Sequence, residues 1–253
     1  MTSGGLLFSR YAYPPNSHGY CGPDKPRELL EHVAAGVDDG ELRHLAKGFE
    51  GAWPYLELIA GAAGIGDPLD ARVVEAYWIG NPLLDQVSPS LMGGSMEERF
   101  RARACRVWPQ LIDAVPAGAL PHHSFHVFGI YPWLGLLRSG RMEEPLHVLD
   151  QCRIRWGQVV EITAGRAMVR SRPLSWDGRS LGLGEPRIEE VVLGVDGLAL
   201  TTALQVGDWC SLHWDWICDG LGPRQLRAIQ TYSLRQLRVV NGLPYSAPAS
   251  VLS

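Results

Sequence analysis

The stretch Cys152-Arg-Ile-Arg-Trp-Gly-Gln-Val-Val-Glu-Ile162 marks the point where the sequence changes from helical to strand-like character. From Arg153 to Ile162, β-branched and aromatic residues stand among polar ones, a composition typical of a β-strand. Ala164-Gly165 then predicts a turn, and Ala167 to Arg170 predicts the partner strand. This stretch therefore opens a β-rich region.

Two further signals place more strands downstream of this hairpin. Ile188–Val195 and Leu198–Ala203 predict a second hairpin around Asp196-Gly197, a dipeptide that suits a tight turn. Val206-Gly207-Asp208 predicts a turn that leads into a strand at Trp209–Trp214. Several short strands separated by turns favour a small OB-like β-barrel.

Helical patterns flank the β-rich region on both sides. Residues 1 to about 26 contain Pro14, Pro15 and several glycines, which predict an irregular arm packed by its aromatic residues. Helices are expected from Pro26, at Asp39–Ala63, Asp67–Ile79, Met96–Val115, Ser124–Ser139 and Glu143–Asp150, and finally at Pro223–Val240. We therefore predict an α+β protein with two domains. Residues 1–150 form a helical domain with the arm, and residues 151–253 form an OB-like barrel with a terminal helix.

The composition is that of an ordinary globular chain. Hydrophobic residues make up 46% and charged residues 20% of the sequence, and the formal net charge is −4. An acidic balance argues against a nucleic-acid partner, which usually requires a basic face. The polar, turn-rich N-terminus is not a signal peptide, the longest apolar stretch is too short to cross a bilayer, and five cysteines do not suggest a disulfide scaffold. A cytoplasmic location without membrane contact is expected.

A cysteine and a histidine frame the predicted barrel. Gly157 follows Cys152 closely, Val206-Gly207-Asp208 precedes His213, and a helix follows. This ordered set resembles the HypC-type chaperones of nickel–iron hydrogenase maturation over about the last 100 residues. Trp156 stands where that family has a proline, and 151 residues precede the cysteine instead of a mature N-terminus.

The resemblance implies that Cys152 and His213 together handle iron carrying cyanide and carbon monoxide ligands. A soft thiolate with an imidazole suits such iron. It also implies a cytoplasmic metallochaperone or assembly factor rather than an enzyme, with a HypD-like maturation protein or the hydrogenase large-subunit precursor as its partner. The alternative from composition alone is that Cys152 packs as a small hydrophobe and His213 is a hydrogen-bonded strand histidine.

The N-terminal part carries a second group of candidate ligands. In Pro121-His-His-Ser-Phe-His126, His122 and His126 would share one face if a helix begins there, and both could then hold one metal. His123, His18 and Cys21 are further candidates for that site. The alternative is that these histidines bond to backbone groups at the start of a helix. The segments Tyr13-Pro-Pro-Asn16 and Tyr20-Cys-Gly-Pro23 resemble an uncharacterised bacterial family encoded near hydrogenase genes.

Two other classes of function stay open. One is an iron-dependent enzyme that makes or modifies a diatomic ligand with the N-terminal histidines and cysteine. The other is a metal-free protein-interaction module. The sequence has no nucleophile elbow, P-loop, Rossmann glycine set or H-E-x-x-H motif, and it offers no catalytic residue from these templates.

Overall fold

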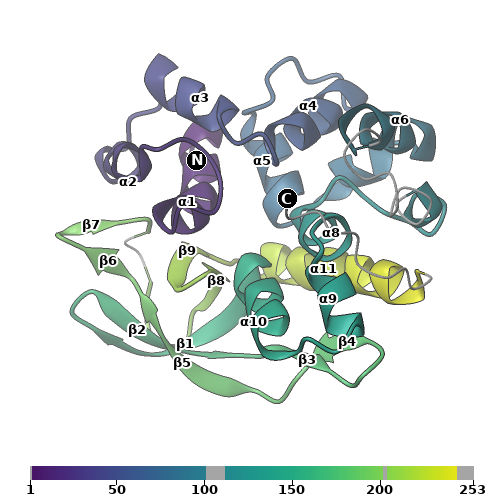
Figure 1. Ribbon diagram of the computed structural model, residues 1–253. Helices are drawn as coiled ribbons and strands as arrows, with labels where there is room; N and C mark the ends of the chain where they lie inside the picture. Colours follow the sequence, from purple (N-terminus) through teal and green to yellow (C-terminus); the bar gives the residue numbers. More distant parts are fainter. Residues whose placement is uncertain (1, 101–111, 202–203, 244–253) are drawn as a thin grey trace.

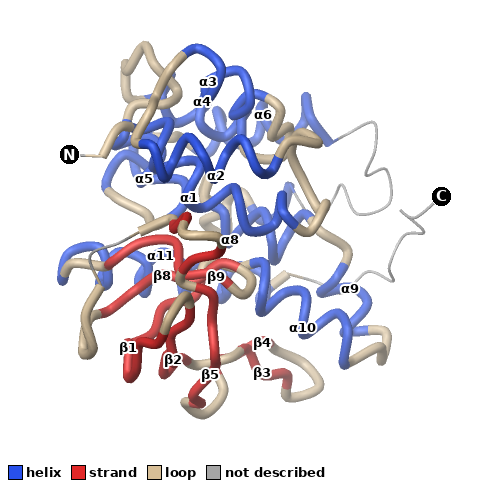
Figure 2. The backbone as a smooth tube through the Cα atoms, turned by 90° about the vertical axis from the view of Figure 1, so that its left-hand side faces the viewer, coloured by secondary structure: helices blue, strands red, loops and turns tan. Residues whose placement is uncertain are grey.

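The computed structural model describes residues 2–100, 112–201 and 204–243. Helices of the N-terminal half lie above a set of strands, and the helix α1 lies directly over the strands β8 and β9 (Figures 1 and 2). The C-terminal helix α11 returns to pack against the short helix α8 of the N-terminal half. The two ends of the described chain are thus both built into the helical side of the molecule.

Among the described residues, the longest helices are α11 with 20 residues and α1 with 14. The described α-helices are α1 (Gly4–Ser17), α2 (Pro26–Ala35), α3 (Gly40–Lys47), α4 (Trp53–Ala62), α5 (Ala71–Trp78), α6 (Pro89–Phe100), α8 (His123–Phe125), α9 (Trp133–Arg138), α10 (Glu143–Cys152) and α11 (Pro223–Gly242). The described residues also form a 3₁₀-helix, η1 (Pro82–Gln86), and a π-helical turn, η2 (His126–Ile130).

The strands occupy the region predicted for them. They are β1 (Arg155–Thr163), β2 (Arg166–Ser171), β3 (Leu174–Trp176), β4 (Leu181–Leu183), β5 (Arg187–Val192), β6 (Gly194–Val195), β7 (Leu198–Ala199), β8 (Trp209–His213) and β9 (Trp216–Gly220). The order β1-β2-β5-β9-β8 closes on itself, because β1 also pairs with β8 and a parallel bridge joins Val192 of β5 to Trp216 of β9. The α+β class is confirmed, whereas the closer likeness to an OB barrel stays a prediction.

The irregular arm predicted for the first 26 residues is wrong for most of its length, because Gly4–Ser17 form α1. Ser3 caps this helix by accepting a hydrogen bond from the backbone N–H of Leu6. Pro14 and Pro15 lie inside the helix, which tertiary packing of buried Phe8 and Tyr11 holds in place. The aromatic residues Tyr11 and Tyr13 are buried as expected, but Tyr20 is 62% exposed.

Two predicted long helices are interrupted. The helix expected at Asp39–Ala63 is divided into α3 and α4 around the turn that holds Phe49 and Gly51. The helix expected at Ser124–Ser139 becomes α8, the π-helical turn η2 and α9. Part of the helix expected at Met96–Val115 lies outside the described residues. Both interruptions place loops or irregular turns beside the cavity described below.

One apolar core joins the helices to the strands. It contains Phe8 and Tyr55 from the first half together with Trp216 and Ile229 from the second. A second, smaller cluster fills the inside of the barrel and includes Val169 and other strand residues. The change from helix to strand falls within a few residues of position 150, as predicted, but the two halves share a core across that point.

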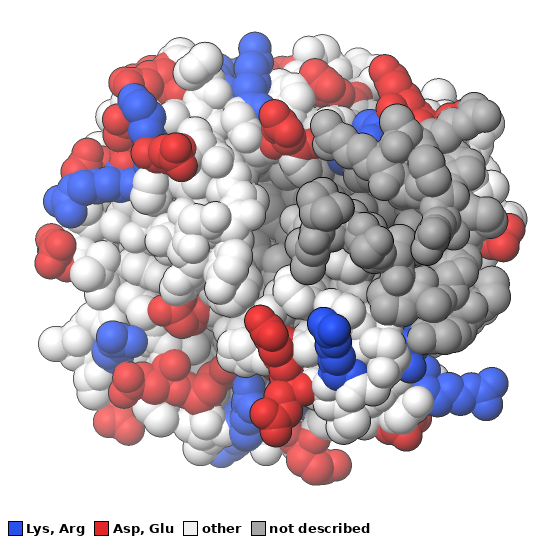
Figure 3. All heavy atoms as spheres, in the orientation of Figure 1, with Lys and Arg blue, Asp and Glu red and all other residues white. Residues whose placement is uncertain are grey.

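The charged side chains are mixed on the face seen in Figure 3. Acidic and basic groups lie together along its upper and lower margins, and uncharged side chains occupy the centre of the described surface. Among the described residues, none of the helices has the length and apolarity needed to cross a membrane.

Candidate metal centre

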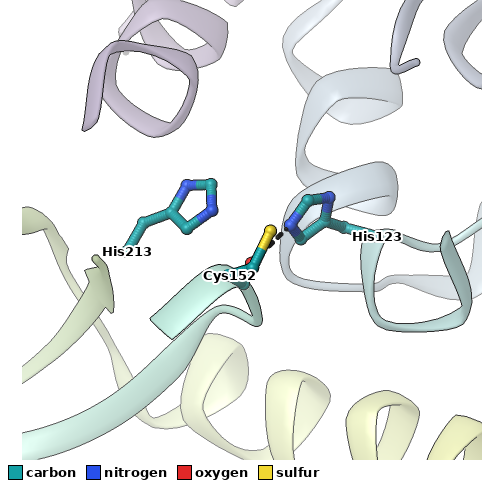
Figure 4. Close-up of side chains that lie close together, drawn as sticks. All are labelled: His123, Cys152 and His213. Carbon is teal, nitrogen blue, oxygen red and sulfur yellow. Dashed lines mark hydrogen bonds between the residues drawn. The ribbon is translucent and has the colours of Figure 1, made fainter. Parts of the chain in front are cut away.

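His123, Cys152 and His213 converge from three separate elements of the fold. Their ligand atoms, one per residue, lie within 4.8 Å of one another. His123 is the first residue of α8, Cys152 is the last residue of α10, and His213 is the last residue of β8. Figure 4 shows the thiol of Cys152 between the two imidazole rings. The predicted approach of Cys152 and His213 is present, and His123 joins them as a third possible ligand.

The prolines of α1 explain how His213 is oriented. In an α-helix the carbonyl of Tyr11 would accept from the N–H of residue 15, but Pro15 has no N–H. The Tyr11 carbonyl instead accepts a 2.6 Å hydrogen bond from Nδ1 of His213. This fixes the proton of the neutral ring on Nδ1 and leaves Nε2 with a lone pair. Nε2 has no hydrogen-bond partner within the described part of the chain, which is the state that a metal ligand requires.

A buried arginine ties the ends of α10 and β8 together. The backbone N–H of Trp214, next to His213, donates to the carbonyl of Gln151, next to Cys152, at 2.9 Å. Arg155 donates to the side chain of Gln151 at 3.0 Å, to the Trp214 carbonyl, and to Glu189 at 2.6 Å. The Arg155 side chain is 1% exposed. Arg155 therefore fixes Gln151 relative to Trp214, and these two residues are the chain neighbours of Cys152 and His213.

His123 is differently placed, because both of its ring nitrogens already have partners. Nε2 donates to the backbone carbonyl of Cys152 at 2.8 Å, so Nδ1 of the neutral ring accepts from the hydroxyl of Tyr77 at 3.2 Å. The ring also packs against Trp78, with a centroid separation of 4.6 Å. Binding of a metal by His123 requires one of these two hydrogen bonds to be given up.

The triad opens into a cavity of about 340 Å³. Five of the seven residues predicted as ligands line it: His123, Cys152, His213, His126 and Cys21. Asn16 holds the Cys21 loop by donating to the carbonyls of Cys21 and Pro23, both at 2.7 Å. The Tyr-Pro-Pro-Asn segment therefore has two structural roles: Pro15 frees the carbonyl that orients His213, and Asn16 places the loop that carries Cys21.

The predicted pairing of His122 with His126 is wrong. The helix begins at His123, and His122 is its N-cap, with Nδ1 accepting from the backbone N–H of Ser124 at 3.1 Å. The ring of His122 faces Tyr232 of α11, at a centroid separation of 6.2 Å, and not the cavity. His18 is also elsewhere, because its Nε2 lies 3.0 Å from a carboxylate oxygen of Asp215 at a half-exposed position.

Burial sets the protonation state of the triad. Desolvation lowers the pKa of His123 to about 4 and lowers the pKa of His213 well below its usual range, so both rings are neutral at pH 7. Burial, with a smaller contribution from Cys21, raises the pKa of Cys152. The site thus offers two neutral imidazoles and a thiol that must lose its proton before it can bind a metal.

The sequence matches a family of unknown function, DUF6390, over residues 1–247. The chain belongs to this family. The match runs through both the helical half and the barrel, so α1 with its two prolines and the strand ending in His213 fall within one family unit. No curated protein and no solved structure was found to match the chain.

The donor set determines which metals suit the site. One thiolate and two imidazoles favour a late transition metal such as iron, copper or zinc over magnesium or calcium, which prefer oxygen ligands. Three protein ligands on one side of a cavity leave a coordination position open to it. In chemical terms, the triad can hold a transition metal and present it to a molecule in the cavity.

Sequence reasoning missed the residues that support the triad. Arg155 and Tyr11 act through a buried side chain and a backbone carbonyl, and neither has a motif. One signal was available for Tyr11: a proline inside a helical pattern frees the carbonyl four residues earlier. The prediction of an irregular arm places Pro15 outside any helix, so this signal does not lead to Tyr11.

Proposed function

We propose that this protein binds iron through Cys152, His213 and His123 and serves as an accessory protein in the maturation of nickel–iron hydrogenase. One observation carries the proposal: the cysteine and the histidine that the HypC-type resemblance pairs lie in a group whose ligand atoms are within 4.8 Å of one another, although 61 residues separate them in the sequence. On this proposal the β-region is an OB-like barrel that carries the iron ligands.

The proposed cargo is an iron unit with cyanide and carbon monoxide ligands. A thiolate and imidazoles are suitable donors for low-spin iron. The cavity beside the triad is lined mainly by apolar and aromatic residues, including Trp78 and Tyr131, and would shield small uncharged ligands from water. The partner would be a HypD-like maturation protein or the hydrogenase large-subunit precursor, which would receive or supply this unit.

A second candidate function is an iron-dependent enzyme that makes or modifies a small ligand. The observation that favours it is the enclosure of the triad. His123 and Cys21 come from the N-terminal half and line the same cavity as Cys152 and His213. A partner protein would have to reach a thiol at the wall of this cavity, whereas a small molecule would enter it. Transfer of iron to a partner supports the accessory role, and turnover of a small molecule supports the enzyme.

The test is elemental analysis together with infrared spectroscopy of protein purified without oxygen. The proposal predicts close to one iron per chain and absorption bands of metal-bound cyanide and carbonyl. Cys152→Ala and His213→Ala should abolish both signals, and they should also abolish hydrogenase maturation in cells. Cys210→Ala is the matched control, because Cys210 is buried in the barrel core and its change should affect neither signal. A metal-free protein that supports maturation would instead favour the interaction module.

A further inference from the structure

The cavity beside the triad is much larger than a metal with diatomic ligands requires. Its volume of about 340 Å³ lies within the range of roughly 300–1,000 Å³ that is usual for small-molecule sites. An apolar cavity of about 150 Å³ is already sufficient to hold benzene. A cavity of this size therefore has room for an organic molecule of at least one aromatic ring system.

The walls are aromatic on several sides. Phe49, Tyr77 and Trp78 come from the N-terminal half, and Tyr131 and Trp133 come from the segment around η2. Tyr20 and Trp214 also belong to the wall and stack on each other, with ring centroids 4.4 Å apart and planes inclined by 17°. Because Tyr20 is largely exposed, this stacked pair forms the side of the cavity that is next to solvent. Flat apolar molecules gain most from such walls.

The charge of the wall disfavours anions. Among the described residues that line the cavity there is no lysine or arginine, and the one carboxylate is Glu144, at an exposed position of α10. Arg99 is outside the wall: it donates to the carbonyl of Gly51 at 3.2 Å, and its guanidinium lies over the ring of Tyr55 at 4.1 Å. An anionic ligand would meet Glu144 without a cation among the described wall residues to compensate.

Four residues of the wall, Trp78, His126, His213 and Trp214, carry a buried polar atom without a hydrogen-bond partner among the described residues. The two indole nitrogens can only donate and His213 belongs to the triad, so Nδ1 of His126 is the atom outside the triad that can accept a hydrogen bond from a ligand. His126 is 6% exposed, and its Nδ1 has no hydrogen-bond partner within the described residues. A buried nitrogen without a partner is costly, because it has lost water and gained nothing in exchange. His126 begins the π-helical turn η2, an irregularity that is frequent at functional sites.

We infer that this cavity binds an uncharged, aromatic organic molecule that forms a hydrogen bond with His126. The inference goes beyond the proposed function, because it rests on the walls of the cavity and on His126 and requires no metal. If the triad also holds a metal, the same molecule lies next to the open coordination position, as a substrate or as a ligand.

Isothermal titration calorimetry of chelator-treated full-length protein tests this inference with two probes of equal ring size. Naphthalene-2-methanol should bind with measurable heat, and naphthalene-2-carboxylate should bind at least about tenfold more weakly. Val148→Trp places an indole in the cavity wall and should weaken binding of the alcohol by about tenfold or more. Val37→Trp is the matched control at an exposed position outside the wall and should leave binding unchanged.

Two further variants, His126→Phe and Glu144→Gln, test the inference even if Val148→Trp does not fold. His126→Phe preserves the ring but removes the nitrogen, so affinity for naphthalene-2-methanol should fall about fivefold while affinity for naphthalene stays the same. Glu144→Gln should raise the affinity for the carboxylate. Absence of binding to the wild type, equal loss in Val37→Trp, or preferred binding of the carboxylate would overturn the inference. Binding of the alcohol by protein that never takes up iron would retain it and reject only the proposed function.

Discussion

The two histidines of the triad differ in how ready they are to bind a metal. His213, at the end of β8, has its proton fixed on Nδ1 by the Tyr11 carbonyl and leaves Nε2 without a partner among the described residues. His123, at the start of α8, uses both nitrogens, one toward the Cys152 carbonyl and one toward the Tyr77 hydroxyl. His213 is therefore already oriented to bind a metal, whereas His123 must first give up a hydrogen bond.

This difference has an energetic meaning. A ligand that is already oriented loses little conformational freedom on binding, whereas a ligand that must break a buried hydrogen bond loses part of its interaction energy. Cys152 lies between the two and is fixed relative to His213 by the Arg155 contacts. Cys152 and His213 should thus form the stronger part of the site, and His123 should add to it.

Replacement of the ligands should give the largest effect. Cys152→Ser and His213→Ala should lower iron affinity by more than about a hundredfold, since removal of a supporting residue alone typically costs 10- to 100-fold. His123→Ala should lower the iron affinity less, because the His123 side chain must give up a hydrogen bond before it can bind the metal. Equilibrium competition with a chelator measures all three affinities. If His123→Ala and His213→Ala lower the iron affinity equally, the two histidines do not differ in how ready they are to bind the metal.

Arg155→Met should destabilise the whole protein. The change leaves the half-buried carboxylate of Glu189 without its main partner. Breaking a fully buried ion pair typically costs about 3–5 kcal/mol, so a loss below that range is expected here. Urea unfolding of the metal-free protein measures the loss. Arg155→Met combined with Glu189→Gln should recover part of it. If Arg155→Met alone is as stable as the wild type, Arg155 does not hold the ends of α10 and β8 together.

Pro15→Ala should weaken the site while leaving the helix intact or stronger. An alanine restores an N–H that competes with His213 for the Tyr11 carbonyl, and it removes a proline from a helix interior. We expect iron affinity to fall about tenfold, as is typical for loss of a supporting contact, with no decrease in thermal stability. Pro14→Ala is the control, because it restores the bond to Arg10 and not to Tyr11. Equal affinities for all three proteins would contradict the role assigned to Pro15.

Metal binding should release one proton near pH 7. Burial keeps the Cys152 thiol protonated in the metal-free protein, and both imidazoles are already neutral. The apparent affinity should therefore fall about tenfold for each unit by which the pH is lowered between 8 and 6. Chelator competition at several pH values gives the slope. A slope of zero in this range would show that the thiol is not a ligand.

Tyr77→Phe should give the smallest effect, and in the opposite direction. Removal of the hydroxyl frees Nδ1 of His123 from its hydrogen bond, so iron affinity should stay the same or rise a few fold. The metal-free protein should lose about 1 kcal/mol of stability, a usual value for one hydrogen bond. A loss of affinity comparable to that of Pro15→Ala would mean that the tyrosine orients His123 instead of competing for it.

The barrel was more predictable from the sequence than the helical half. Turn signals are local: Asp196 and Gly197 both have positive φ in the β6–β7 hairpin, as that dipeptide predicts. Val206-Gly207 forms the predicted turn before β8. The segment Gly4–Ser17 is helical because of contacts with distant residues, such as the stacking of Tyr11 on Trp78 at 5.6 Å. Such contacts override the local meaning of two prolines.

The candidate site was predictable in its barrel pair and not in its third member. The resemblance placed Cys152 and His213 together, but the pairing of His122 with His126 requires His122 to lie inside the helix, whereas it is the N-cap, with φ −119° and ψ 143°. A residue with extended backbone does not follow the helical repeat, so the i, i+4 spacing does not bring the two rings onto one face. Which of the three histidines meets Cys152 depends on the packing of α8 against α5 and α11, which the sequence does not encode locally.

X-ray absorption spectroscopy of the iron-loaded protein reports the atoms bound to the metal and so tests the ligand set directly. We expect one sulfur ligand and at least two imidazole nitrogens per iron in the wild type. The sulfur signal should be lost in Cys152→Ser and unchanged in Cys210→Ala. An iron centre with only oxygen and nitrogen ligands in the wild type would contradict the assignment of Cys152, His213 and His123 as the metal centre.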